Sequence, residues 1–315
     1  MSEPTAPPPG SARVAVVGSV NIDHIVRAHD FPLPGETVLG ISHTTAVGGK
    51  GANQAAAAAR FGAEVHLVAQ VGADDDATAA LGWLRECGVD VSGVGTSQDA
   101  GTGTAWITVC SGENAIVVVP GANGRWPPAD HQLGRAADAE IVLAQLEVPV
   151  DVVRRAALLP GTFVLNAAPA MELPDEVVAR CDVLIVNESE LATLTGTRGA
   201  ATDHAGMIDA QRSLLARGAK AVVATLGADG ALLATPHRVV HQPALATRVL
   251  DTTGAGDAFC GVFAAELARG GTLEQATRCG VAAGSLAVQY ATAQMTFDRW
   301  AVDAAMALLP RSILK

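Results

Sequence analysis

Short apolar runs alternate with helix-like segments along most of this chain of 315 residues. The run 13–18 (RVAVVG) shows no polar alternation and ends in glycine, which is typical of a buried strand that feeds a loop. Repeated strand–helix units need right-handed crossovers, so the pattern predicts an α/β fold with a mostly parallel sheet covered by helices on both faces. We expect strands at 13–18, 64–71, 140–146, 163–166, 183–186 and 221–225, and helices at 50–61, 76–87, 150–158, 255–269, 273–290 and 298–309.

Two segments depart from this pattern. Residues 23–47 and 102–119 are rich in β-branched side chains and show no helical periodicity. We therefore predict a small antiparallel sheet that stands apart from the main body and is built from these two separate pieces. Residues 1–11 are rich in proline and predict a disordered tail, which leaves 12–310 as a single domain.

Composition and charge exclude several classes of protein. Hydrophobic residues make up 49% of the chain, enough for a large core, and the net charge of −11 argues against a non-specific nucleic-acid binder. No run reaches the ~18 apolar residues of a membrane span, and the chain opens without a basic, apolar leader. The five cysteines form no CxxC pair, so we expect reduced thiols in a soluble cytoplasmic protein.

The most informative motif is 251–259 (DTTGAGDAF), which opens an alanine-rich helix. Gly254, Ala255 and Gly256 carry little or no side chain, so their N–H groups can approach an anion at the helix N-terminus. Asp257 lies in the first turn, where the same field keeps a carboxylate ionised, as a general base requires. Donors for a phosphate beside a base indicate phosphoryl transfer. The alternative is a loop whose Asp257 only caps the helix.

Two further polar segments precede the first long helix. The run 48–54 (GGKGANQ) resembles a phosphate loop but lacks the Ser or Thr that a Walker A motif places after lysine. Its Lys50 and Asn53 lie about one turn apart on one helix face and suit sugar hydroxyls. Asp23, in the run 18–23 (GSVNID) after the first strand, can accept hydrogen bonds from two hydroxyls. The alternatives are a flexible loop for the first segment and an Asx turn for the second.

Polar residues also follow the later strands. Asn166 ends one strand, the run 187–190 (NESE) begins a helix after another, and 225–230 (TLGADG) is a strand-to-turn segment whose glycines admit a nucleotide. Carboxylates at a helix start satisfy the helix dipole or hold Mg²⁺ through water. The eight histidines show no ligand spacing, so we expect His24, His29 and His43 to be surface or lid residues rather than metal ligands.

Taken in order, these motifs resemble the ribokinase-like (phosphofructokinase-B) sugar kinases. The resemblance covers about residues 12–300, and it rests on GSVNIDHI, PLPGETV, GGKGANQAAAAA, SGENAIVVVPGANG, LAQLEVP, LNAAPA, NESE, TLGADG and DTTGAGDAF. It implies a three-layer fold with a mostly parallel central sheet, and a small β-sheet lid from about 23–47 and 102–119. Lids of this family commonly pair between subunits, so the resemblance also implies a homodimer.

The resemblance assigns roles to individual residues. It implies sugar contacts at Asn21, Asp23, Gly49, Lys50, Asn53, Glu147 and Asp257. It implies an anion hole at Gly254, Ala255 and Gly256, with Asp257 as the base. It implies nucleotide contacts at Asn187, Thr225, Gly227 and Gly256, and Mg²⁺ held through water by Glu190. It implies a monovalent cation, usually K⁺, at Asp251, Thr253 and Thr296, although Thr292 and Met295 depart from the family's pattern beside Thr296.

The expected activity is ATP-dependent phosphorylation of D-ribose at its 5-hydroxyl. A kinase of the same fold for a nucleoside, 2-deoxyribose or another sugar is the alternative. The bulky Trp106 of the lid would limit room for a base if it pointed toward the sugar, but the sequence does not set its direction. A non-catalytic sugar sensor is disfavoured because Asp257 and the 254–256 loop are intact. A dinucleotide oxidoreductase is disfavoured because no GxGxxG follows the first strand.

Overall fold

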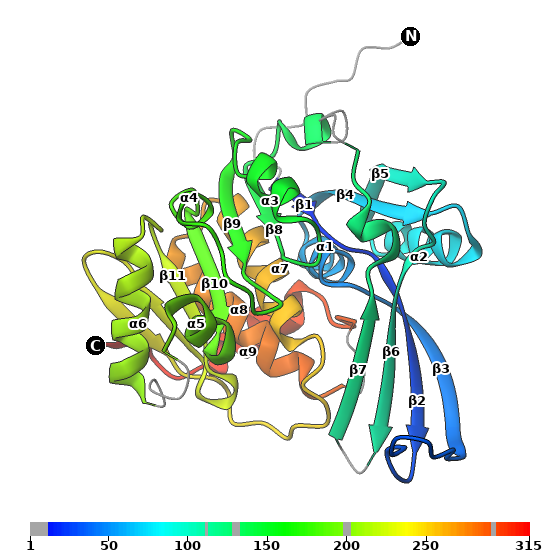
Figure 1. Ribbon diagram of the computed structural model, residues 1–315. Helices are drawn as coiled ribbons and strands as arrows, with labels where there is room; N and C mark the ends of the chain where they lie inside the picture. The colour runs from blue at the N-terminus through cyan, green and yellow to red at the C-terminus, as the bar shows by residue number, and fades with distance from the viewer. Residues whose placement is uncertain (1–11, 111–112, 128–132, 198–202, 291–293) are drawn as a thin grey trace.

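A ten-stranded central sheet forms the middle layer of the protein (Figure 1). The computed structural model describes residues 12–110, 113–127, 133–197, 203–290 and 294–315. The strands follow the order β14-β13-β12-β11-β10-β9-β8-β1-β4-β5. Their bounds are β1 Arg13–Val17, β4 Glu64–Gly72, β5 Val89–Ser97, β8 Ile141–Ala144, β9 Thr162–Asn166, β10 Val183–Asn187, β11 Val222–Thr225, β12 Ala231–Ala234, β13 Val239–Gln242 and β14 Ile313–Leu314.

The sheet is parallel from β5 to β11 and antiparallel from β11 to β14. The predicted α/β fold with a mostly parallel sheet is therefore confirmed. The pattern did not predict β5, β12, β13 or β14. The last three pair antiparallel, outside the strand–helix units from which the strands were predicted.

Helices cover both faces of this sheet. Along β1, Val14 and Val16 pack into the core beneath α1, α2, α7, α8 and α9, while Ala15 and Val17 pack into the core beneath α3 to α6. In the described part of the chain, no helix is long and apolar enough to cross a membrane. The helix bounds are α1 Lys50–Arg60, α2 Asp75–Glu86, α3 Val150–Ala156, α4 Asp175–Val178, α5 Glu188–Thr195, α6 His204–Ala216, α7 Ala255–Ala268, α8 Leu273–Ala287 and α9 Arg299–Leu308.

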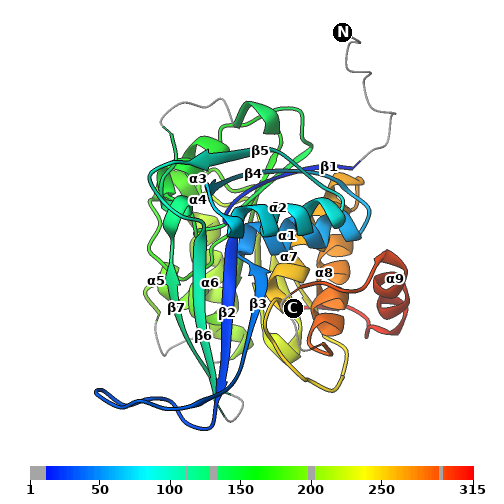
Figure 2. The ribbon, with the colours of Figure 1, turned by 90° about the vertical axis from the view of Figure 1, so that its right-hand side faces the viewer.

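A separate four-stranded sheet projects from the main body, as Figures 1 and 2 show. Its order is β3-β2-β6-β7, with β2 Asn21–Ala28, β3 Gly40–Gly48, β6 Gly103–Cys110 and β7 Glu113–Val119. The prediction of a wholly antiparallel sheet was wrong, because β2 and β6 pair in parallel, with Asn21 opposite Gly103. Both strands leave the main body at the same place and run outward together. The tail 1–11 and Ser111–Gly112 of the predicted turn lie outside the described residues.

The base of the small sheet is tied together by Asn123, which is buried in the 3₁₀ turn η1 (Gly121–Gly124) after β7. Its Oδ1 accepts from the Val20 N–H at 3.0 Å, and its Nδ2 donates to the Val20 carbonyl at 3.1 Å and to Asn21 Oδ1 at 2.7 Å. Gly103 leaves room for both asparagines, because a side chain there would overlap them. One buried amide thus joins the ends of both pieces of the sheet.

Helices α1 and α7 pack unusually close together at Gly261. A Cβ atom on Gly261 would lie 2.7 Å from the Cβ of Ala57 and 2.9 Å from the Ala58 nitrogen, and it would overlap the carbonyl oxygen of Gln54. The opposing α1 face offers only small side chains at these points, since Ala57 and Ala58 are both fully buried. This contact sets the distance between the start of α1 and the start of α7.

We predict that Gly261→Ala destabilises the protein. Alanine favours a helix over glycine by about 1 kcal/mol, but the added methyl group meets α1 backbone, and overpacking costs roughly 1–3 kcal/mol. Gly82→Ala in α2 is the matched control, because a Cβ there meets nothing within 4 Å. This control gains about 0.5–1 kcal/mol in stability. Urea unfolding measures both changes, and a Gly261→Ala protein as stable as wild type would contradict the close packing.

Candidate active site

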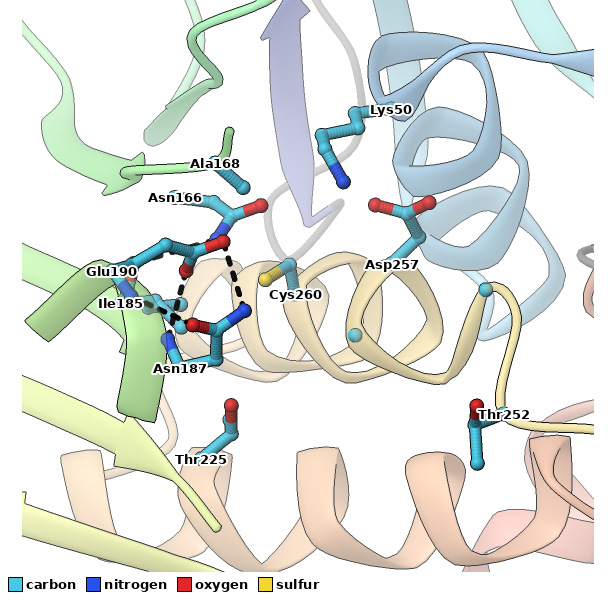
Figure 3. A pocket seen from close by; sticks show the side chains of 12 residues that line it. Lys50, Asn166, Ala168, Ile185, Asn187, Glu190, Thr225, Thr252, Asp257 and Cys260 are labelled. Carbon is cyan, nitrogen blue, oxygen red and sulfur yellow. Dashed lines mark hydrogen bonds between the residues drawn. The ribbon is translucent and has the colours of Figure 1, made fainter. Parts of the chain in front are cut away.

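Polar side chains from several elements meet at the carboxyl edge of the parallel strands, where ligands bind in sheets of this kind. Figure 3 shows Lys50 and Asp257 on one side of a cavity, with Glu190 and Asn187 on the other. The cavity measures about 220 Å³. It is lined by Lys50, Asn166, Ala168, Ile185, Asn187, Glu190, Thr225, Thr252, Gly254, Gly256, Asp257 and Cys260. The structure thus brings together predicted residues that lie up to about 200 positions apart in the sequence.

Asp257 is buried in the first turn of α7, with 8% of its surface exposed. Its Oδ2 accepts a hydrogen bond from Asn53 Nδ2 at 3.1 Å, and its Oδ1 accepts one from Gln54 Nε2 at 2.9 Å. Burial raises the pKa of Asp257, while the charge of Lys50 and the two amide donors oppose that rise. The carboxylate is therefore held by donors on both oxygens in a place that would otherwise favour its neutral form.

Lys50 begins α1 and reaches into the cavity toward Asp257 (Figure 3). The negative charge of Asp257 raises the pKa of Lys50, against burial, which lowers it. The Lys50 N–H donates to Glu147 Oε2 at 2.9 Å, and the Ser19 hydroxyl donates to the same oxygen at 2.5 Å. Glu147, which follows β8, thereby fixes the start of α1.

Asn21 and Asp23 lie at the start of β2, where the small sheet leaves the main body. Asn123 holds the Oδ1 of Asn21, as described above. The Asp23 carboxylate lies directly against Gly48, where a side chain would overlap it. Burial raises the pKa of Asp23 to about 6, and the charges of Glu147 and Asp257 add to the rise. The predicted Asn21 and Asp23 therefore belong to the same charged environment as Asp257.

Trp106 does not lie on the face of the small sheet that carries Asp23. It pairs in register with His24, and the two rings stack at 4.2 Å. Because successive residues of a strand point to opposite faces, His24 and Trp106 lie on the face away from Asp23. The direction of Trp106, which the sequence left open, is therefore away from Asp23, so this side chain does not narrow the space beside Asp23.

The predicted anion-binding segment forms the start of α7. Gly254 takes a left-handed conformation with φ of 77°, which glycine adopts without strain, and the helix begins at Ala255. The helix runs for 14 residues, so its first N–H groups carry the partial positive charge of a full dipole. Gly254 and Gly256 line the cavity beside Asp257. The first turn of α7 thus offers donors to an anion next to a carboxylate.

Asn187 and Glu190 form a capping box at the start of α5. Glu190 Oε2 accepts from the Asn187 N–H at 2.8 Å, its Oε1 accepts from Asn187 Nδ2 at 3.0 Å, and Asn187 Oδ1 accepts from the Glu190 N–H at 2.8 Å. Burial raises the pKa of Glu190, while the hydrogen bond from Asn187 and the charge of Lys50 oppose it. Since both carboxylate oxygens already hold donors, Glu190 suits a cation better through water than by direct ligation.

A second, larger cavity of about 800 Å³ adjoins the first and shares Asn187, Thr225, Thr252 and Gly256 with it. Predicted Thr225 and Gly227 lie on its wall, but most of the lining was not predicted. The additional residues come from the segment 244–249 and from α8, and include Ala244, Leu245, Ala246, Thr247, Val249, Val281, Gly284, Ser285 and Val288. These residues are mostly small or apolar, so no charge or motif marks them in the sequence.

Asp251 and Thr253, predicted to bind a monovalent cation, lie in the loop before α7. Asp251 Oδ1 accepts hydrogen bonds from the Thr253 N–H at 2.8 Å and from the Thr253 hydroxyl at 2.6 Å. Thr296 is exposed near Met295, which is buried. Thr292 lies outside the described residues. Asp251 and Thr253 therefore lie together in this loop, and the cation site itself stays a prediction.

Two functional side chains escaped the sequence reasoning. Gln54 contacts Asp257 directly, and Asn123 orients Asn21. Both lie inside runs on which the family resemblance rests, GGKGANQAAAAA and SGENAIVVVPGANG. A glutamine one position after Asn53 reads as an ordinary polar helix residue, and only the packing of α1 on α7 reveals its partner.

Comparison with known proteins identifies the family. The family model described as pfkB family carbohydrate kinase matches residues 11–299. A ribokinase of Haemophilus influenzae is 35% identical over 288 residues, which cover 89% of this chain and 94% of that protein. A deoxyribokinase of Salmonella typhi is 35% identical over 278 residues, covering 85% of this chain and 90% of that protein.

A longer relative and a solved structure support the same family. A bifunctional ribokinase/ribose-5-phosphate isomerase A of Fructilactobacillus sanfranciscensis is 38% identical over 291 residues, which cover 90% of this chain. The chain spans about half (54%) of that relative's length. The structure of Arabidopsis thaliana ribokinase complexed with ribose and ATP superposes with a TM-score of 0.88 at 31% identity, covering 94% of this chain and 99% of that one. The chain belongs to the pfkB family of carbohydrate kinases.

Proposed function

We propose that this sugar kinase transfers the γ-phosphoryl group of ATP to the 5-hydroxyl of D-ribose, giving ribose 5-phosphate and ADP. The observation that carries the proposal is the position of Asp257. Its carboxylate lies between the sugar-side residue Asn53 and the helix start that lines the cavity, with the Lys50 side chain beside it. Phosphoryl transfer needs a base for the attacking hydroxyl, hydrogen-bond donors for the phosphate oxygens and a positive charge, all close together.

Asp257 acts as the general base of this reaction. It accepts the proton of the 5-hydroxyl as that oxygen forms a bond to the γ-phosphorus, and the bond from the γ-phosphorus to the β,γ-bridging oxygen breaks to release ADP. The N–H groups of Gly254, Ala255 and Gly256 stabilise the charge on the transferring group. Lys50 balances the remaining negative charge, since its charge already faces Asp257.

Asp23 and Asn21 hold the ring hydroxyls of the sugar in this proposal. The carboxylate of Asp23 accepts from two hydroxyls, Asn21 adds a second polar group beside it, and Gly49, Lys50, Asn53 and Glu147 complete the sugar site. A diol grip of this kind favours ribose over 2-deoxyribose, which lacks one hydroxyl. The alternative, a kinase for 2-deoxyribose, a nucleoside or another sugar, is supported by the likeness to the Salmonella deoxyribokinase.

The larger cavity suits the nucleoside part of ATP. Its volume of about 800 Å³ and its apolar wall fit a purine. Asn187, Thr225 and Gly256 lie where it meets the smaller cavity, and Gly227 lies on its own wall. ATP would then reach from the larger cavity into the smaller one. Its γ-phosphate would lie beside the first turn of α7.

Two metal ions accompany ATP in this proposal. Glu190 fits Mg²⁺ held through water, because both of its oxygens already accept hydrogen bonds. When bound, Mg²⁺ neutralises phosphate charge. Asp251, Thr253 and Thr296 would hold K⁺ near the anion-binding turn. Dependence of turnover on MgCl₂ and KCl concentrations tests both ions.

We further propose that 12–310 form a single domain whose small sheet acts as a lid over the sugar and pairs with a second copy in a homodimer. The outer strand β7 supports the pairing, because Ile116, Val117, Val118 and Val119 are each about half exposed or more. Sedimentation of the full chain measures the oligomeric state.

A cytoplasmic location is supported by the five cysteines, which are all unpaired and buried.

We expect D-ribose to give the highest kcat/KM in an ADP-release assay that compares ribose, 2-deoxyribose, fructose and adenosine. Phosphorus NMR of the product then shows a phosphate on the 5-oxygen. A higher value for 2-deoxyribose or adenosine selects the alternative substrate class. Absence of turnover with every acceptor, in the presence of Mg²⁺ and K⁺, would contradict the proposed function.

We predict that Asp257→Asn lowers kcat by about 10²–10⁴-fold, because an amide cannot accept the hydroxyl proton. Sugar binding persists, since the shape of the site is unchanged. Turnover is followed by ADP release and sugar affinity by calorimetry. Near-wild-type kcat in this variant would overturn the assignment of the base.

We predict that KM for the sugar rises as the pH falls below about 6. The pKa of Asp23 is raised to about 6, so the carboxylate is ionised above this pH and protonated below it. The protonated form loses an acceptor for the sugar hydroxyls, while kcat at saturating sugar changes less. Asp23→Asn raises KM roughly ten-fold and removes its dependence on pH in this range. A wild-type KM that stays constant from pH 5 to pH 8 would show that Asp23 does not grip the sugar.

A further inference from the structure

A chain of buried amide side chains ends on Asp257. Gln145 Nε2 donates to Gln54 Oε1 at 2.7 Å, and Gln54 Nε2 donates to Asp257 Oδ1 at 2.9 Å and to Asn166 Oδ1 at 3.0 Å. Both glutamines are fully shielded from solvent. Neither has a part in binding or phosphorylating the sugar in the function proposed above.

The surroundings fix the direction of the Gln54 amide. The ionised carboxylate of Asp257 can only accept a hydrogen bond. Asn166 donates its Nδ2 to the Ile185 carbonyl at 3.4 Å, which leaves its Oδ1 to face Gln54. Gln145 supplies a donor at the other end of the Gln54 amide. All three contacts place the Gln54 nitrogen, rather than its oxygen, toward Asp257.

The side chain of Gln145 carries a buried acceptor without a hydrogen bond to any described residue, which lowers the stability of the folded protein. Its Oε1 is buried and has no hydrogen-bond partner among the described residues. It fits only because Gly18 has no side chain, since a Cβ atom there would overlap this oxygen. An apolar side chain would avoid a buried, unpaired acceptor. The donor of Gln145 is therefore the part of this side chain that the site uses.

We propose that Gln54 is a positioning residue that keeps Asp257 ionised and fixes the plane of its carboxylate, and that Gln145 holds Gln54 in the required direction. The role of Asp257 as base rests on the proposed function. Burial pushes this carboxylate toward its neutral form, and the Gln54 amide is one of the groups that oppose burial. By bonding Asn166 as well, Gln54 ties the base to the end of β9 and so to the cavity wall.

Gln54→Met and Gln145→Met test the proposal, with Gln211→Met as the matched control. Gln211 is equally buried, donates to the Val222 and Leu232 carbonyls, and also has an unpaired Oε1, but it lies in α6 away from the site. All three variants lose a buried amide of the same size. Thermal unfolding of each variant confirms that it folds and measures the loss of stability.

We expect the acid limb of the kcat–pH profile to move up by about one pH unit in Gln54→Met, because a donor to the ionised carboxylate is lost. At a pH on the acid limb, kcat falls by up to about ten-fold, the loss shrinks as the pH rises above that limb, and KM for the sugar changes little. Gln145→Met shifts the profile less, in the same direction. Gln211→Met lowers the unfolding temperature and leaves the profile in place. A Gln54→Met profile that superposes on wild type, or a loss of kcat equal at every pH, would overturn the proposal.

A second measurement does not depend on turnover. Carbon NMR of protein labelled at the aspartate carboxyl groups follows the titration of Asp257, which Asp257→Asn assigns by loss of its signal. The titration moves to higher pH in Gln54→Met if the proposal holds, and an unmoved titration contradicts it. Failure of the sugar-kinase proposal would appear instead as absent turnover in wild type, with the NMR shift intact.

Discussion

The candidate site depends on the close approach of α1 and α7. A glycine on α7, Gly261, meets the α1 backbone beside Gln54, and the facing α1 residues Ala57 and Ala58 are small. A larger residue at this contact would separate the helices by the width of a methyl group or more, and hydrogen bonds of 2.9 to 3.1 Å do not survive such a shift. The scarcity of large side chains in α1 therefore lets Asn53 and Gln54 reach Asp257.

Charge is the second constraint. Among the described residues that line the smaller cavity, Lys50 is the only cationic side chain, whereas Asp257 and Glu190 both face it, and Asp23 and Glu147 lie nearby. Burial and mutual repulsion raise the pKa of Asp23, Glu190 and Asp257. A polyphosphate entering this site meets an excess of negative charge on a chain that is itself acidic. In the proposed function, backbone N–H donors at α7 and bound cations would offset this negative charge.

Sequence reasoning located the site better than it described the site's surroundings. Glycine-rich helix starts and carboxylates after strands carry chemistry in their residue types, so Lys50, Glu190 and Asp257 were predicted and are found around one cavity. The larger cavity was missed because its wall is apolar and comes from segments far apart in the chain. Sequence reasoning also could not predict that β2 pairs in parallel with β6, or toward which face of the small sheet Trp106 points. Both depend on where the two strands leave the main body, which the sequence pattern does not encode.

The small sheet and the residues proposed to bind the sugar share the same backbone. Asn21 is the first residue of β2, and Gly48, the last residue of β3, directly precedes the segment that begins α1. Asn123 ties Val20 and Asn21 to the end of the other hairpin, so the base of the sheet is held by buried hydrogen bonds that cost free energy to break. Any closing motion must therefore bend the sheet beyond this clamp, which leaves Asn21 fixed while the outer strands move. If the small sheet acts as the proposed lid, Asn21 is in place before closure, so binding spends less conformational entropy, and closure has the separate task of excluding water.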